Sequence, residues 1–377
     1  MKVAQLTFNT YNNYGNVLQK YALQKTLEKF VDFTEVLWFN GNAGSSHFWA
    51  ETGDVPQGYP IAHYLRDAVR MSKFKAFDER YIKTRFNLPY LEETADEYDF
   101  FVIGSDQVWN PFCEPYNMPL NIKFLNFVPN EKKIAYAASI ARHDLPDEIK
   151  DIFRDGISTF PHVSVREENA VRIIEELGLE PPLLVLDPVF LLTRDEWLKI
   201  ARRPSWFNEK YERGYILTYF IHHLPSPELM SWLAESKLPF INLLRVRSIN
   251  FYTKNFNHYT TSPEEFLYLM AHASLVVASS FHGVAFPILF KRPFINCESD
   301  ATSTHYMAMR IPSLLKTFGL ENRVIYTDDF HKIDSPFEVD FSHRDKVLPP
   351  ERMKAFNFLS KALGVEVPAE LMEVDAQ

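Results

Sequence analysis

The feature that most constrains the fold of this chain is an alternation of short apolar segments with longer amphipathic ones along most of its length. Residues 2–8 are mostly apolar, and a polar turn follows at 9–15. Apolar residues then recur every three to four positions, which predicts an amphipathic helix over 16–30. Strands and helices that alternate in this way form parallel sheets with helices on both faces. We therefore expect an α/β fold.

The alternation restarts after Asp187-Pro188, which places a domain boundary near 187–205. We expect a first domain over 1–190, a second over 191–345, and a C-terminal helix and tail over 346–377. A Gly-, Ser- and Pro-rich stretch predicts a long loop at 41–60. The other expected strands lie at 98–103, 133–138, 162–165, 183–186, 215–221, 240–244 and 275–278, and the other expected helices at 61–85, 167–177, 262–273, 284–290, 305–320 and 349–363.

Charge and cysteine content argue against several classes of protein. The 377 residues carry a formal net charge of −9, whereas proteins that bind nucleic acid or anionic membranes usually carry a basic excess. Cys113 and Cys297 are the only cysteines, too few for a disulfide framework or a cysteine zinc site. Polar residues interrupt both the N-terminal segment and the apolar run at 273–290, so neither a secretory signal nor a membrane span is expected. We expect a cytoplasmic protein.

Polar residues are dense where the expected strand at 98–103 ends. Gly104, Ser105, Asp106 and Gln107 follow it directly, and Val108-Trp109-Asn110 comes next. Open α/β sheets bind ligands at the carboxyl ends of their strands, so this junction is a candidate site. An Asx turn in which Asp106 caps the next segment explains the same residues, and both interpretations stay open.

A second polar junction, Ser279-Ser280-Phe281-His282-Gly283, lies between a strand and a helix. The N–H groups at the start of a helix favour an anion, and glycine lets that anion approach the backbone closely. His282 can donate to an anion or move a proton near neutral pH. A single histidine is more often structural, but its place between strand end and helix start favours a function.

Other polar groups are weaker candidates. The adjacent His222 and His223 would point to opposite faces of a strand, which makes a poor metal pair. Arg245 and Arg247 share one face of a strand, and a solvated basic face explains them, while Lys291-Arg292 fits a surface turn. The chain contains no phosphate-loop, dinucleotide-fingerprint or nucleophile-elbow motif, which argues against P-loop NTPases, NAD enzymes and α/β-hydrolases.

Five blocks of the sequence resemble the polysaccharide pyruvyl transferase family and occur in that family's order. They are Asn13-Tyr14-Gly15-Asn16 with Gln19 and Ala22-Leu23, then 103–110, 164–167, 185–189, and 280–283 with Phe286 and Pro293-Phe294-Ile295. The family often has Thr-Asp or Thr-Asn before Ser-Phe-His-Gly, whereas Ala278-Ser279 stands here. A role that needs a carboxylate at position 279 is therefore in doubt.

The resemblance implies two Rossmann-like domains facing across a cleft, as in GT-B glycosyltransferases, with the acceptor on the N-terminal domain and the donor on the C-terminal one. The implied reaction transfers the pyruvate unit of phosphoenolpyruvate onto two hydroxyls of a sugar or glycan, giving a pyruvate ketal and phosphate. No metal or organic cofactor is expected. A lipid-linked acceptor would add peripheral membrane contact, and no nucleic acid is expected as a partner.

The resemblance also implies roles for particular residues. His282 is the candidate general acid or donor clamp, and Asp106 the candidate general base or acceptor ligand. The remaining donor-binding candidates are Arg166, Ser280, Phe281, Gly283 and Arg310. The remaining acceptor-binding candidates are Asn13, Gly15, Asn16, Gln19, Trp109 and Asn110.

Two other functions fit the same residues. A GT-B-like glycosyltransferase would hold the diphosphate of a nucleotide sugar at the same helix N-terminus. A non-catalytic carbohydrate-binding relative would keep the fold without the activity, and Ala278-Ser279 is the feature that favours it.

Overall fold

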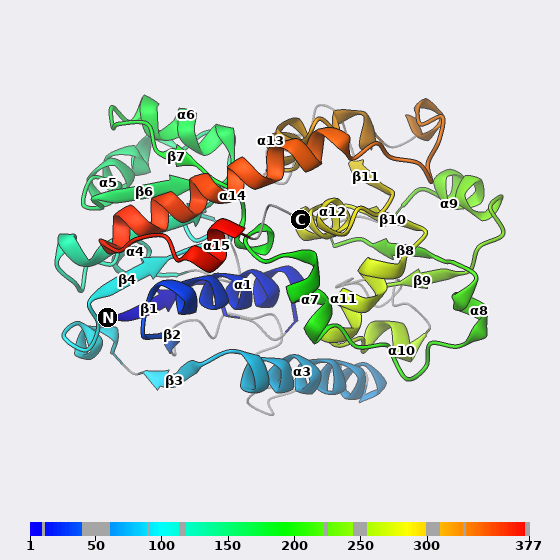
Figure 1. Cartoon of the computed structure of the whole chain (residues 1–377), viewed down its shortest axis with the longest axis horizontal. Coiled ribbons are helices and arrows are strands. Elements are labelled where there is room, and N and C mark those ends of the chain that lie inside the picture. Colours follow the sequence, from blue (N-terminus) through cyan, green and yellow to red (C-terminus); the bar gives the residue numbers. More distant parts are fainter. Residues whose placement is uncertain are drawn as a thin grey trace. The chain divides into compact units, whose positions relative to one another are not determined.

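The structure is a computed structural model that describes residues 1–9, 12–39, 61–88, 90–112, 118–221, 225–243, 255–298, 310–326 and 329–373. The expected loop at 41–60 and the residues Cys113, His222, His223, Arg245 and Arg247 lie outside these ranges. The chain divides into two compact units (Figure 1). Unit 1 consists of Met1–Pro56, Lys75–Leu192 and Leu348–Gln377, and unit 2 of Gln57–Phe74 and Thr193–Val347.

Unit 1 contains a seven-stranded sheet whose neighbouring strands all pair in parallel (Figure 1). The strand order is β3-β2-β1-β4-β5-β6-β7. The first six strands therefore follow the 3-2-1-4-5-6 order of dinucleotide-binding folds. The strands are β1 (Lys2–Leu6), β2 (Phe33–Phe39), β3 (Thr84–Leu88), β4 (Phe100–Ile103), β5 (Lys133–Ala138), β6 (His162–Val165) and β7 (Leu183–Leu184).

Helices cover both faces of this sheet. On one face, strand residues such as Ile103 pack with α4 (Leu120–Lys123), α5 (Asp147–Ile157) and α6 (Glu168–Glu176). On the other face, strand residues such as Val102 pack with α1 (Tyr14–Phe30), the C-terminal part of α14 (Ser342–Leu363) and α15 (Ala369–Glu373). The alternation of side chains along each strand places neighbouring residues in these two separate cores.

The grouping of α14 with unit 1 differs from the separate C-terminal segment expected at 346–377. Ala355, Phe356 and Leu359 of α14 share a buried cluster with Leu23 and Leu27 of α1. This apolar contact joins residues more than 300 positions apart, which no local pattern specifies. The division between the units falls inside α14 and also inside α3 (Ile61–Tyr81).

Unit 2 contains a five-stranded parallel sheet in the order β12-β11-β10-β8-β9. Numbered from the first strand of this unit, the order is 2-1-3-4-5, the second common order of doubly wound sheets. The strands are β8 (Ile216–Tyr219), β9 (Phe240–Asn242), β10 (Leu275–Ala278), β11 (Phe294–Glu298) and β12 (Val324–Tyr326). The helices are α7 (Arg194–Ile200), α8 (Glu209–Glu212), α9 (Pro227–Ala234), α10 (Phe256–Tyr259), α11 (Pro263–His272), α12 (Phe281–Phe290) and α13 (Arg310–Phe318).

Both faces of the unit 2 sheet are also covered. Leu275, Val277, Ile295 and Cys297 face a core that includes α9. On the opposite face, rings of β8, α11, α12 and α7 pack edge to face, through Tyr219, Phe266, Phe286 and Trp197. The two sheets confirm the expected α/β class with two Rossmann-like domains.

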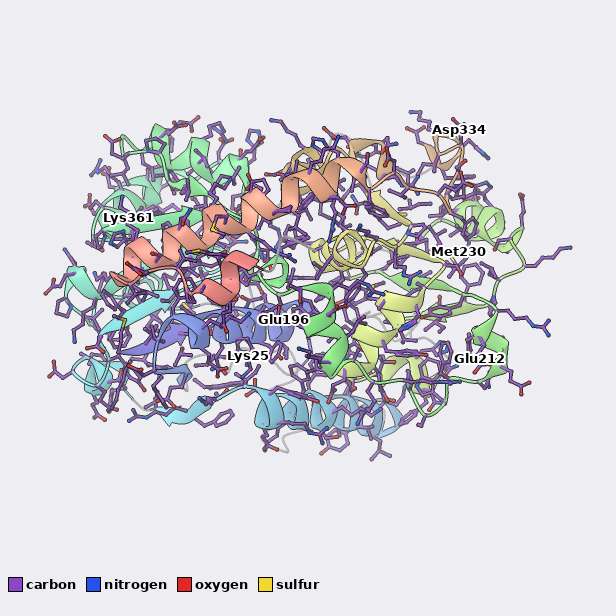
Figure 2. All side chains as sticks on the ribbon, viewed as in Figure 1. Lys25, Glu196, Glu212, Met230, Asp334 and Lys361 are labelled. Atoms are coloured by element: carbon purple, nitrogen blue, oxygen red, sulfur yellow. The ribbon has the colours of Figure 1, made fainter. Side chains whose placement is uncertain are left out.

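Helix boundaries follow local capping chemistry. α7 begins with a capping box in which Thr193 and Glu196 bind each other's backbone N–H groups; Glu196 is labelled in Figure 2. Exposed charged residues such as Glu212 and Lys361 lie at the surface in the same view. α12 begins at Phe281, three residues before the expected start, because Ser280 caps it.

A buried histidine makes the stability of unit 2 dependent on pH. The Nδ1 atom of His258 accepts from the Asn242 N–H at 3.3 Å, so the ring is neutral. Burial, and then the charge of Lys210, lowers the pKa of His258 to about 4. The folded state thus binds fewer protons, and stability is lost as pH falls from about 6.5 towards 4.

We expect acidification from pH 7 to pH 5 to cost about 2 kcal/mol of unfolding free energy through this residue. Urea unfolding at the two pH values would measure the loss, with fluorescence of Trp206, whose ring lies 5.0 Å from the His258 ring, as a local probe. His258→Asn keeps an acceptor for the Asn242 N–H and removes the titrating group. Its loss of unfolding free energy between pH 7 and pH 5 should therefore be about 2 kcal/mol smaller than that of wild type. Equal losses in the two proteins would contradict the prediction.

Candidate functional site

Both polar junctions lie where the strand order of their sheet reverses. In unit 1 the reversal falls between β1 and β4, and Ser105 and Asp106 follow β4 directly. In unit 2 it falls between β8 and β10, and Ser280 and His282 follow β10. Open α/β sheets bind ligands at the carboxyl ends of strands at such points. Each unit therefore presents one candidate site at its own switch point.

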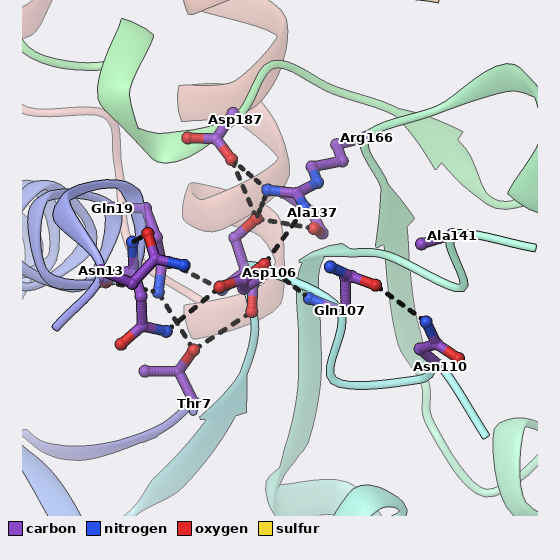
Figure 3. Close-up of polar contacts among 12 residues, drawn as sticks. Thr7, Asn13, Gln19, Asp106, Gln107, Asn110, Ala137, Ala141, Arg166 and Asp187 are labelled. Carbon is purple, nitrogen blue, oxygen red and sulfur yellow. Dashed lines mark hydrogen bonds and ion pairs between the residues drawn. The ribbon is translucent and has the colours of Figure 1, made fainter. Parts of the chain in front are cut away.

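In unit 1, side chains from β1, α1 and β4 interlock at the sheet edge (Figure 3). Thr7 Oγ1 donates to the Ser105 carbonyl oxygen at 3.1 Å and accepts from Gln19 Nε2 at 3.1 Å. The Ser105 N–H donates to Gln19 Oε1 at 3.2 Å. Gly104 allows this close packing, because its φ is +127° and a Cβ there would overlap the Tyr136 carbonyl oxygen.

Arg166 lies at the centre of this edge, directly after β6 (Figure 3). Its Nη1 donates to Asp187 Oδ2 at 2.6 Å, and its Nη2 donates to Asp106 Oδ1 at 3.4 Å. Its Nε lies 3.8 Å from Glu167 Oε2. The side chain is only 1% exposed. Three strand ends thus converge on one buried guanidinium.

The electrostatics around Arg166 favour its charged form. Burial lowers the pKa of the guanidinium, but Asp187, Asp106 and Glu167 outweigh burial, and the pKa lies above its ordinary value. Three carboxylates around one guanidinium leave this edge with local negative charge. The expected direct binding of an anionic donor by Arg166 therefore does not fit the structure, whereas orientation of Asp106 does.

Asp106 is the member of this cluster that reaches solvent, with its side chain 12% exposed. Its Oδ2 accepts from Asn16 Nδ2 at 3.1 Å, and its Oδ1 accepts from the Gln107 N–H at 2.9 Å. The second bond goes to the N–H of the next residue, one position short of the N–H that an Asx turn uses. The contacts to Arg166 and Asn16 come from distant segments, so tertiary contacts also hold this carboxylate in place.

The first turns of α1 bring the other acceptor-side residues to this edge. Asn13 caps the helix by accepting from the Asn16 N–H at 3.4 Å, and Gly15 lies in the first turn. Asn16 contacts Asp106, and Gln19 holds Thr7 and Ser105. The structure brings these expected residues together with Asp106 at one edge of unit 1.

Trp109 corrects an expectation. Its ring is fully buried and packs edge to face on Phe160 at 5.8 Å. Its Nε1 donates to the Lys123 carbonyl oxygen at 3.1 Å. The side chain is part of the core and presents no face to a sugar. Asn110 is also buried and bonds to Gln107 and to the Phe112 N–H, so it holds the loop in shape.

In unit 2, Ser280 caps α12 by accepting from the Gly283 N–H at 3.0 Å. A Cβ at position 283 would lie 2.7 Å from Ala278 Cβ and 3.1 Å from a ring carbon of Tyr219. Glycine thus lets the helix start rest directly on β10 and β8. The first turn of α12, where N–H groups carry partial positive charge, is fixed at the sheet edge.

His282 and Arg310 accompany this helix start. His282 is 8% exposed, and its ring lies 5.2 Å from the ring of Phe281. The guanidinium of Arg310, the first residue of α13, lies 5.9 Å from the same ring. Ser279, where the family often has an acid, accepts from the Ile221 N–H at 3.3 Å. All expected donor-side residues except Arg166 therefore gather in unit 2.

Several polar residues at these edges were not named as site residues from the sequence. Asp187 and Glu167 surround Arg166 in unit 1, and Glu298 ends β11 in unit 2, two residues after the buried Asn296 of the same strand. Glu298 is the last residue of its strand, and Glu167 and Asp187 follow β6 and β7 within three residues, which is the signal that could have identified these three. Among the described residues, no group of three or more His, Cys, Asp or Glu side chains has the arrangement of a metal site.

Comparison with known sequences decides the family. The sequence model of the polysaccharide pyruvyl transferase family matches residues 13–300. The chain belongs to this family. Membership places it among transferases that act on polysaccharides, as the five sequence blocks predicted. No curated protein matches the chain significantly.

Solved structures support the fold of this family member. The UDP-N-acetylglucosamine 2-epimerase of Rickettsia bellii matches with a TM-score of 0.50 and 10% identity, over 97% of this chain and 95% of that one. The UDP-GlcNAc 2-epimerase of Neisseria meningitidis, bound to UDP-GlcNAc, has a TM-score of 0.44 and 10% identity over 100% and 98%. The Rickettsia likeness confirms the GT-B-like class of fold; a cleft between the domains stays a prediction. No helix in the described ranges is long and apolar enough to cross a membrane.

Proposed function

We propose that this protein transfers the pyruvate unit of phosphoenolpyruvate onto two hydroxyls of a glycan sugar and releases phosphate. Family membership supports the class of reaction. The observation that carries the donor assignment is the Ser280-capped start of α12, with His282 and Arg310 beside it at the switch point of unit 2. Phosphoenolpyruvate is made in the cytoplasm, which is the location we propose for this protein.

The donor side suits a small, highly charged anion. Phosphoenolpyruvate carries a phosphate and a carboxylate, and helix N–H groups together with an arginine bind such groups well. Gly283 lets the first turn of α12 pack directly on β10 and β8, which fixes the helix start at the sheet edge. His282 donates to the phosphate or transfers a proton, and Arg310 supplies a full positive charge.

The acceptor side suits a sugar. Asp106 reaches solvent at the edge of unit 1, and a carboxylate there accepts a proton from an attacking hydroxyl. Asn13 and Asn16 offer amide groups for sugar hydroxyls, whereas Gln19 is fully buried and holds Thr7 and Ser105 in place. Arg166 is a positioning residue in this scheme, because it holds Asp106 and Asp187 without reaching solvent itself.

The reaction balances with these groups. The methylene carbon of the donor gains one proton and becomes a methyl group. One sugar hydroxyl attacks the adjacent carbon and loses its proton to a base, and the second hydroxyl displaces phosphate and loses its own. Two protons leave the sugar hydroxyls. One of them restores the acid that protonated the methylene carbon, and the other leaves with phosphate.

The test is incubation with phosphoenolpyruvate and a panel of sugar acceptors. Phosphate release, together with an acceptor mass gain equal to pyruvic acid less water, would support the proposal. Release without the mass gain would indicate simple hydrolysis and contradict it. Binding of phosphoenolpyruvate without any release would favour a non-catalytic carbohydrate-binding relative.

A thermal shift comparison separates the glycosyltransferase alternative. Ligand stabilisation grows with occupancy, so phosphoenolpyruvate should raise the melting temperature more than UDP- or GDP-sugars at equal concentration. The opposite order would favour a nucleotide-sugar donor.

A further inference from the structure

Glu298 ends β11, the strand that neighbours β10 in the sheet of unit 2. Ala278 of β10 lies directly opposite Asn296 of β11. Glu298 is two residues further along, level with the point where β10 gives way to Ser280 and α12. This carboxylate therefore lies at the same sheet edge as the proposed donor site.

The side chain of Glu298 also lies on the face of the sheet that α12 covers. Leu275, Val277, Ile295 and Cys297 all face the opposite core. Side chains alternate along a strand, so Ala278, Asn296 and Glu298 face the other way. Ala278 is the residue that a Cβ at Gly283 would meet, which identifies this other face as the one under the first turn of α12.

A hydrogen bond holds Glu298 there. Asn296, which is fully buried, donates from Nδ2 to Glu298 Oε1 at 3.0 Å. The charge of Arg310 also acts on the Glu298 carboxyl, and its guanidinium lies 5.9 Å from the Phe281 ring. Arg310 is therefore near enough to influence both Glu298 and the residue next to His282.

The surroundings of this carboxyl favour its protonated form. Burial raises the pKa of Glu298, and the Asn296 hydrogen bond and the charge of Arg310 offset only part of the increase. Burial and then Glu298 raise the pKa of the neighbouring Cys297 thiol, which stays neutral. Among the described residues, Arg310 is the charged group that acts on Glu298, and Cys297, its neighbour in β11, faces the opposite core.

We propose that Glu298 is the acid that protonates the methylene carbon of phosphoenolpyruvate, while His282 and Arg310 hold its phosphate and carboxylate. This inference rests on the function proposed above. The Glu298 O–H bond breaks, a C–H bond forms at the methylene carbon, and the adjacent carbon becomes electrophilic. A sugar hydroxyl then attacks that carbon and gives its proton to a base, and the second hydroxyl displaces phosphate. The proton of the first hydroxyl passes from the base through solvent to the Glu298 carboxylate before the next turnover.

The test compares Glu298→Gln with wild type, His282→Ala and the control Glu321→Gln, which removes an exposed carboxylate of the same unit. We expect Glu298→Gln to lower kcat by about 10²–10⁴-fold while phosphoenolpyruvate still raises its melting temperature. The His282→Ala variant should lose that ligand-dependent rise, and Glu321→Gln should behave as wild type. Glu298→Asp should recover part of the lost kcat.

The pH profile gives a second readout. Wild-type kcat should fall as pH rises through the pKa of Glu298, and Glu298→Gln should lack that decline. If Glu298→Gln loses stabilisation by phosphoenolpyruvate, or keeps more than a third of the wild-type kcat, the inference is wrong. If Glu298→Gln does not fold, a Glu298→Asp profile identical to wild type would refute it. Wild type that never releases phosphate would instead refute the proposed function.

Discussion

His282→Ala is expected to lower kcat/KM for phosphoenolpyruvate by about 10²–10⁴-fold and to leave the fold intact. His282 lies in the first turn of α12, where the backbone N–H groups and Arg310 favour an anion. Removal of the ring takes away a donor to the phosphate. The fold should survive, because the cap of this helix comes from Ser280 and not from His282.

Steady-state phosphate release and urea unfolding measure the two parts of this prediction. His331→Ala, which removes an exposed histidine of the same unit, is the matched control and should keep full activity. His282→Asn should restore part of the binding, since its amide can still donate. Wild-type activity in His282→Ala would remove His282 from the site.

Asp106→Asn is expected to lower turnover by about 10²–10⁴-fold with little change in stability. Asparagine keeps an oxygen for the Gln107 N–H but cannot take a proton from a sugar hydroxyl. Arg166 still has Asp187 at 2.6 Å and Glu167 at 3.8 Å, so its buried charge remains balanced.

Asp187→Asn is the matched variant, because it changes a carboxylate of the same cluster that is fully buried. It removes the closest partner of a buried guanidinium and should cost about 3 kcal/mol of unfolding free energy. Equilibrium unfolding measures the stability of both variants, and initial rates measure their activity. Asp106→Asn should lose activity but keep its stability, whereas Asp187→Asn should lose stability. If Asp106→Asn loses stability as much as Asp187→Asn does, Asp106 is a structural residue and the proposed base lies elsewhere.

Local patterns in the sequence predicted much of the fold and the positions of the two polar junctions. β4, β5 and β10 lie within a few residues of their expected positions, and Asp106 and His282 follow β4 and β10 at the carboxyl edge. These predictions succeed because strand ends, helix caps and polar junctions depend on residues only a few positions apart.

The sequence did not show which polar and aromatic residues near strand ends are buried. Arg166 and Trp109 each lie near a strand end, in the same kind of segment as Asp106. Arg166 is enclosed by carboxylates from three other positions, and Trp109 is packed on Phe160. Their partners are up to 60 positions away. The local pattern therefore does not distinguish a side chain that reaches solvent, such as Asp106, from one that is fully enclosed.

From the order of its residues alone, this chain specified alternating strands and helices, their caps, and polar groups at strand ends. The folded molecule added which strands became neighbours: β1 lies beside β4, with Val3 opposite Phe100, and this pairing creates the switch point beside Asp106. It also placed Glu298 on the face beneath α12. The physical reason is that local propensities act over a single turn, whereas strand neighbours are selected by the burial of a whole sheet between its helices.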